Sequence, residues 1–125
     1  MGKKEIHDDA LNIVKQVVAG MQDKKAKNIV SLDMSEIPNA VSHFFVICHA
    51  PSKTQVGAIY DGILEKVTNN CGVYPVHREG HENSEWILID YFDVVVHVFL
   101  EETRSFYNLE SLWADAKRTV YESDL

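Results

Sequence analysis

Apolar residues recur in the first part of the chain with the period of a helix. The apolar positions are Leu11, Val14, Val17, Val18 and Met21. Polar residues lie between them, so the pattern predicts an amphipathic helix over residues 8–23. A short strand over residues 28–34 and a turn over residues 35–39 are predicted to follow.

The middle of the chain contains a continuous apolar run at residues 44–48, which includes aromatic and β-branched side chains. Such a run is typical of a central strand that is buried on both faces. Ser52 and Gln55 have the spacing of a capping box, which satisfies backbone donors in the first turn of a helix. We therefore expect a helix to begin at this point and to end near Gly72.

After Gly72 the apolar pattern changes to a period of two. Strands are predicted over residues 73–77, 86–89 and 94–99, with a polar loop over residues 79–84. A closing helix is predicted from the spacing of Leu109, Leu112, Trp113 and Ala116. The predicted order is therefore α-β-β-α-β-β-β-α.

This order predicts an α/β fold in which helices flank a mixed sheet of about five strands. The length of 125 residues suits one domain over residues 1–125. We expect residues 1–6 and 122–125 to be frayed, because chain ends with little to bury are poorly ordered.

The two strands over residues 86–89 and 94–99 form a predicted hairpin with faces of different character. A two-residue loop at Tyr91-Phe92 would place Asp90 opposite Asp93, Leu88 opposite Val95 and Trp86 opposite His97. One face then carries only β-branched aliphatic residues: Ile87, Ile89, Val94, Val96 and Val98. The other face carries Trp86, Leu88, Asp90, Asp93, Val95, His97 and Phe99.

The first of these faces has the composition of a core, and the second has two interpretations. A helix could cover its apolar part and leave the acids as a rim. Alternatively, the face is a protein-binding surface, because interfaces favour aromatic anchors within a charged rim. We favour the binding surface.

The net charge of −7 is concentrated near this hairpin. The acids there are Glu79, Glu82, Glu85, Asp90, Asp93, Glu101 and Glu102. No Lys or Arg lies between residues 79 and 103. The charges either only keep the protein in solution or attract a basic partner. They argue against a dedicated nucleic-acid site, since affinity for phosphates comes largely from Lys and Arg, although aromatic side chains could stack on bases.

The remaining chemistry of the sequence is sparse. Cys48 and Cys71 lack the spacing of a metal or redox motif, and we expect reduced thiols in the cytoplasm. No apolar run approaches the roughly 20 residues of a membrane span. His77 and His81 are four apart but lie in a predicted loop, so we expect no metal site and no cofactor.

Several stretches together resemble the ribosomal silencing factor family, also called the Iojap family. The strongest is residues 90–99, and the others are 44–47, 51–56, 85–90 and 106–113. The similarity extends over about residues 11–117, nearly the whole chain. Phe92 is a departure, because the family commonly has Gly at this position. A Gly would suit a tight turn with positive φ, which Phe adopts only with strain.

The resemblance implies a fold similar to nucleotidyltransferases without enzymatic activity. It implies binding to the L-fourteen protein of the large ribosomal subunit, which hinders joining of the small subunit and represses translation. It leaves open whether the free protein forms a homodimer. Together with the mixed face of the hairpin, it predicts partner contacts at Glu79, Trp86, Leu88, Asp90, Tyr91, Asp93, Val95, His97 and Phe99.

The main alternative is a nucleotidyltransferase that acts on a nucleotide or RNA. That chemistry needs carboxylates arranged to hold Mg²⁺ and a Gly-rich turn for phosphates. Ala50-Pro51-Ser52 contains no Gly, and Asp33 with Glu36 is the nearest approach to a carboxylate pair. We therefore expect no catalytic residues.

Overall fold

A computed structural model describes residues 3–40 and 42–122, and it contains a six-stranded sheet. The strands are β1 (Lys27–Asp33), β2 (Phe44–Ala50), β3 (His77–Glu79), β4 (Trp86–Asp90), β5 (Val94–Leu100) and β6 (Lys117–Tyr121). Their order across the sheet is β3-β4-β5-β2-β1-β6. Only β2 and β5 pair in parallel, and the other neighbours are antiparallel. The predicted mixed α/β fold is confirmed.

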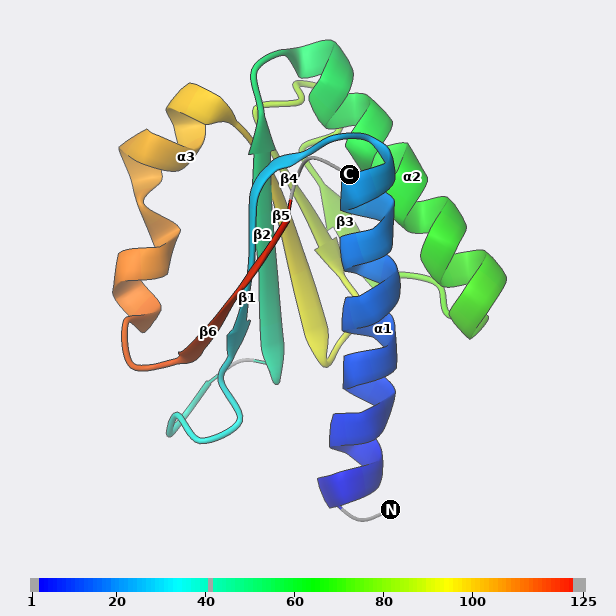
Figure 1. The fold of residues 1–125 in the computed structure, drawn as a ribbon, viewed down its shortest axis with the longest axis vertical. Helices are drawn as coiled ribbons and strands as arrows, with labels where there is room; N and C mark the ends of the chain where they lie inside the picture. The colour runs from blue at the N-terminus through cyan, green and yellow to red at the C-terminus, as the bar shows by residue number, and fades with distance from the viewer. Residues whose placement is uncertain (1–2, 41, 123–125) are drawn as a thin grey trace.

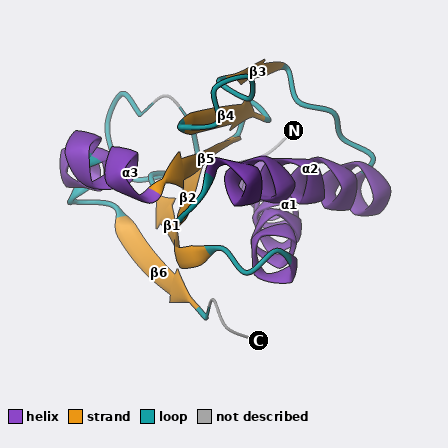
Figure 2. Ribbon diagram, turned by 90° about the horizontal axis from the view of Figure 1, so that it is seen from above, coloured by secondary structure: helices purple, strands orange, loops and turns teal. Residues whose placement is uncertain are grey.

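Helices lie on both faces of the sheet (Figures 1 and 2). The two long helices, α1 (Lys3–Asp23) and α2 (Lys53–Cys71), pack side by side on one face. The short helix α3 (Glu101–Tyr107) and the 3-10 helix η1 (Leu109–Trp113) lie on the opposite face. Neither long helix has an apolar stretch that would span a membrane, and no other helix of the described chain does.

The start and the end of α2 form as the sequence predicts. The Ser52 hydroxyl accepts a hydrogen bond from the Gln55 backbone N–H at 3.2 Å, and Gly72 ends α2 with φ 64°. The two helices approach closely where a Cβ on Gly20 would lie 3.0 Å from the Cα of Ile63. With the sheet they enclose the larger core, which includes the fully buried Val17 and Met21 of α1.

A second, smaller core lies on the other face of the sheet. Its buried members are Val30, Leu32, Met34, Phe45, Ile47, Val95 and Phe99. Leu109 and Trp113 of η1 pack against it, and the ring of Trp113 meets Phe45 edge-on at 5.9 Å. This face is therefore covered by short elements near the C-terminus and not by a long helix.

Arg104 fastens these short elements to the sheet. Its guanidinium donates two hydrogen bonds to the Glu110 carboxylate, both 3.0 Å long, and another to the Asn28 carbonyl at 2.6 Å. The Arg104 hydrogen bonds lower the pKa of Glu110, whereas burial, followed by the Arg104 charge, lowers the pKa of His49. A neutral His49 is suited to accept from Arg104 through Nδ1 at 3.0 Å.

The structure corrects several predicted boundaries. Helix α1 begins at Lys3 and not at residue 8, while residues 1–2 and 123–125, where fraying was expected, lie outside the described residues. The strand expected over 73–77 is instead the short edge strand β3, because Pro75 lacks the N–H that a ladder needs.

The closing helix predicted from Leu109 to Ala116 is also wrong. Helix α3 ends at Tyr107 because the next residue, Asn108, has a positive φ of 48°, and the 3-10 helix η1 follows. The chain then adds β6 beside β1, so the sheet has six strands and not about five. The observed order therefore continues beyond the predicted α-β-β-α-β-β-β-α with η1 and β6.

Gly80 and Gly72 provide a matched test of the β3–β4 connection. Gly80 has φ 87°, and a Cβ there would overlap the backbone carbonyl of Trp86, whereas a Cβ on Gly72 would meet nothing within 4 Å. We expect Gly80→Ala to lower the free energy of unfolding by about 3 kcal/mol and Gly72→Ala by about 1 kcal/mol. Urea denaturation measures both, and equal losses would contradict the close approach at Gly80.

Candidate functional site

The β4–β5 hairpin is the centre of the candidate site, and its register differs from the predicted one. Trp86 lies opposite Phe99, Leu88 opposite His97 and Asp90 opposite Val95. The predicted pairs Asp90–Asp93, Leu88–Val95 and Trp86–His97 are therefore wrong. Each partner is displaced by two residues, so the assignment of side chains to the two faces is unchanged.

The turn explains the displacement, because its centre is at Phe92-Asp93 and not at Tyr91-Phe92. The Tyr91 N–H donates to the Val94 carbonyl at 2.8 Å, and the Asp93 N–H donates to the Tyr91 carbonyl at 3.0 Å. Phe92 has φ 76°, which is disfavoured for a residue with a side chain. An Asp90 carboxylate oxygen accepts from the Phe92 N–H at 2.7 Å and supports this conformation.

The predicted core face of the hairpin is confirmed. Ile87, Ile89, Val94, Val96 and Val98 are all buried in the core that α1 and α2 cover. Tyr91 is also buried on that side, where burial strongly raises the pKa of its hydroxyl. Its side chain has almost no surface to offer to a partner.

The opposite face is partly covered and partly open. Val95, His97 and Phe99 are buried there, so they pack beneath the exposed residues and are not themselves available to a partner. Trp86, Leu88, Asp90 and Asp93 are partly exposed. Glu79 is exposed on β3 and pairs with Leu88, which places it on the same face. The structure thus brings five of the nine predicted contact residues to an accessible surface.

His97 holds the indole of Trp86. Trp86 Nε1–H donates to His97 Nδ1 at 3.0 Å, so Nε2 carries the hydrogen of the neutral imidazole. Nε2 has no hydrogen-bond partner among the described residues. Burial lowers the pKa of His97 to about 4, and the ring of Phe45 packs against it at 4.8 Å. His97 therefore acts as a neutral acceptor beneath Trp86.

Trp86 continues into an exposed aromatic surface that the strand pattern did not predict. Its ring lies 5.0 Å from Tyr107, which contacts Phe106 at 5.0 Å. Phe106 is 80% exposed. Phe106 and Tyr107 belong to the 106–113 stretch, so the family resemblance was a signal for them where periodicity was not.

Asp33 and Glu36, the nearest approach to a catalytic carboxylate pair, line one cavity of about 310 Å³ together with Asp115 and Lys117. One Asp33 oxygen accepts from the Ser35 N–H at 3.0 Å and from its hydroxyl at 2.7 Å. Burial alone would raise the pKa of Asp33, but these hydrogen bonds, together with nearby positive charges such as Lys117, outweigh burial and lower the pKa. Among the described residues, no group of three or more His, Cys, Asp or Glu side chains is arranged to hold a metal ion.

Comparisons with known proteins agree on one family. The family model described as "Ribosomal silencing factor during starvation" matches residues 7–125. A protein of Halalkalibacterium halodurans named ribosomal silencing factor RsfS is 44% identical over 110 residues, which are 88% of this chain and 92% of that protein. The chloroplast protein Iojap of Arabidopsis thaliana is 32% identical over 114 residues, which are 90% of this chain and 47% of that protein.

A solved structure supports the same relationship. The crystal structure of a protein from Chromobacterium violaceum superposes with a TM-score of 0.77 at 32% sequence identity. The match covers 98% of this chain and 96% of the other. At this identity and coverage, the two chains share the whole fold.

The buried His97 predicts a specific loss of stability in acid. The unfolded chain binds a proton at His97 below its ordinary pKa of 6.5, whereas the folded chain does so only near pH 4. Stability should therefore fall as the pH drops through this window, by on the order of 3 kcal/mol from this residue. His97→Gln keeps an acceptor for Trp86 but does not titrate, so we expect this part of the loss to disappear.

Urea denaturation of both proteins at neutral pH and near pH 4 measures the difference. His49 and the carboxylates titrate in both proteins and are cancelled by the comparison. The same pH dependence in the two proteins would show that His97 is not held neutral by burial.

Proposed function

The chain belongs to the ribosomal silencing factor family, and from that premise we propose that it binds the large ribosomal subunit and prevents it from joining the small subunit. The contact on the subunit is its L-fourteen protein, and the result is repression of translation in the cytoplasm. The protein acts by occupying a surface and not by catalysis.

One observation carries this proposal, which is the aromatic surface around Trp86. Trp86 is half-buried, is oriented by His97 and lies beside the exposed Tyr107. An aromatic side chain held in a fixed orientation loses little entropy on binding, and such residues dominate the energy of protein interfaces. The same surface would be available for self-association of the free protein.

The charges around this surface favour a basic protein as the partner. Glu79, Asp90 and Asp93 lie around the hairpin, and no Lys or Arg occurs between residues 79 and 103. Opposite charges at the rim of an interface accelerate association and disfavour the wrong partners. Ribosomal RNA would be repelled by the same charges, so a protein of the subunit is the better match.

Nucleotidyl transfer remains the alternative function, since the resemblance implies a related fold. Asp33 and Glu36 line one cavity, but among the described residues they do not belong to any group of three or more His, Cys, Asp or Glu side chains that could hold a metal ion. The Asp33 carboxylate is engaged by Ser35, and Ala50-Pro51-Ser52 provides no Gly-rich turn for phosphates.

Replacement of Trp86 tests the proposal. We expect Trp86→Ala to weaken binding to isolated large subunits by about 2 kcal/mol or more, because the main anchor is removed. Tyr74→Ala is the matched control, since Tyr74 is an aromatic residue, 73% exposed, in the loop between α2 and β3. It should bind like the wild type in co-sedimentation.

Circular dichroism of the variants separates binding from folding. A folded Trp86→Ala protein that co-sediments as well as the wild type would contradict the role of Trp86. If wild-type protein binds naked ribosomal RNA as tightly as whole subunits, the protein partner is wrong.

A further inference from the structure

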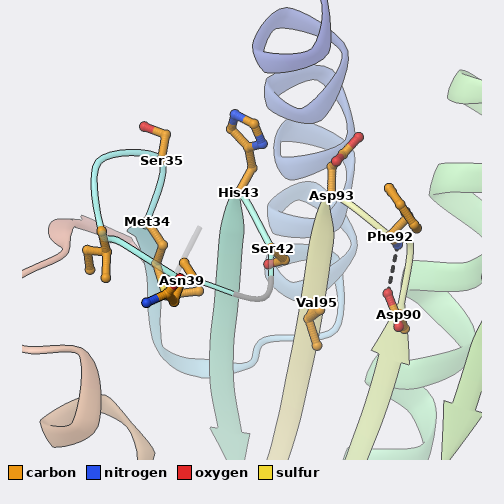
Figure 3. Close-up of a pocket in the computed structure, with 11 residues that line it drawn as sticks. Met34, Ser35, Asn39, Ser42, His43, Asp90, Phe92, Asp93 and Val95 are labelled. Carbon is orange, nitrogen blue, oxygen red and sulfur yellow. Dashed lines mark hydrogen bonds between the residues drawn. The ribbon is translucent and has the colours of Figure 1, made fainter. Parts of the chain in front are cut away.

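A cavity of about 490 Å³ lies at the turn end of the β4–β5 hairpin, at the start of β2 and β5. Figure 3 shows Met34 and Asn39 on one side, the turn residues Asp90, Phe92 and Asp93 on the other, and Val95 between them. Its volume falls within the range of about 300–1,000 Å³ that is usual for ligand sites. It is therefore large enough for one long side chain of a partner.

The cavity combines an apolar floor with carboxylates at its edge. Met34 and Val95 are buried, with exposed fractions of 1% and 8%. Asp90 and Asp93 supply two carboxylates, and none of the residues that line the cavity is Lys or Arg. One oxygen of Asp90 accepts from the Phe92 N–H, which leaves its other oxygen for a ligand. No hydrogen bond joins the Asp93 carboxylate to another described residue.

Phe92 completes the site as an exposed aromatic wall. Its side chain is 74% exposed, and its backbone is held with φ 76° by the hydrogen bonds of the turn. An exposed aromatic face attracts a cation by a cation–π interaction. Each component of the cavity therefore matches one part of a long cationic side chain.

We infer that this cavity receives a basic side chain, arginine or lysine, from the protein partner. The inference rests on the proposed function, since it names the group that the bound protein inserts. Met34 and Val95 would contact the methylene stem, while Asp90 and Asp93 would pair with the charged head. A phosphate group would be repelled by the two carboxylates.

Binding kinetics distinguish insertion into the cavity from general electrostatic attraction. The double variant Asp90→Asn/Asp93→Asn removes two charges but keeps an amide oxygen for the Phe92 N–H. The control double variant Glu82→Gln/Glu102→Gln removes two charges from exposed positions outside the cavity. Loss of charge alone should slow association with large subunits about equally in both variants.

Insertion predicts that only the cavity variant also dissociates faster, by about tenfold, because it loses a direct contact. Thermal unfolding of each variant verifies that the fold is retained. Equal dissociation rates for the two folded double variants would overturn the inference and leave the proposed function standing.

A second measurement does not depend on the ribosome. In NMR spectra of the wild-type protein, N-acetyl-arginine amide at millimolar concentration should shift the amide signals of Phe92, Asp93 and Val95. The uncharged N-acetyl-norleucine amide should not, and the cavity variant should respond to neither. Absence of arginine-specific shifts would overturn the inference. If arginine shifts these signals but the protein does not bind large subunits, the cavity binds a basic side chain and the proposed function is wrong.

Discussion

The parallel pairing of β2 with β5 determines where the other elements of the fold must lie. All seven residues of β2 are buried, and so are the first six of β5. Two such strands at the centre of a sheet need cover on both faces, because exposed apolar surface on either side would destabilise the fold. The parallel direction also requires the long connection that contains α2, β3 and β4.

The cover of the two faces is unequal, and the candidate site follows from this difference. Helices α1 and α2 are both on one face (Figure 2), so the other relies on α3 and η1. Arg104 holds these short elements over β1 and β2, where Trp113 meets Phe45. They do not extend fully over β4, and Trp86 and Leu88 stay partly exposed. A partner that packs on this side would complete the cover of the sheet.

Local sequence rules predicted the parts of the fold that depend on neighbouring residues. The cap at Ser52, the end of α2 at Gly72 and the alternation within β4 and β5 were predictable because each is set within a few residues. The hydrogen bond from Trp86 to His97 was not, since it depends on a register that the turn at Phe92 determines. Strand β6 and the anchoring of α3 were missed because β1, on which both depend, is distant in sequence.

We propose that occupation of the large subunit by this protein prevents its union with the small subunit. Light scattering measures that union directly when the two purified subunits are mixed with Mg²⁺, after the large subunit has been incubated with the protein. We expect the joined fraction to fall as the concentration of wild-type protein rises, and folded Trp86→Ala protein to have little effect at the same concentrations. Undiminished joining while the wild-type protein remains bound to the large subunit would contradict this proposal.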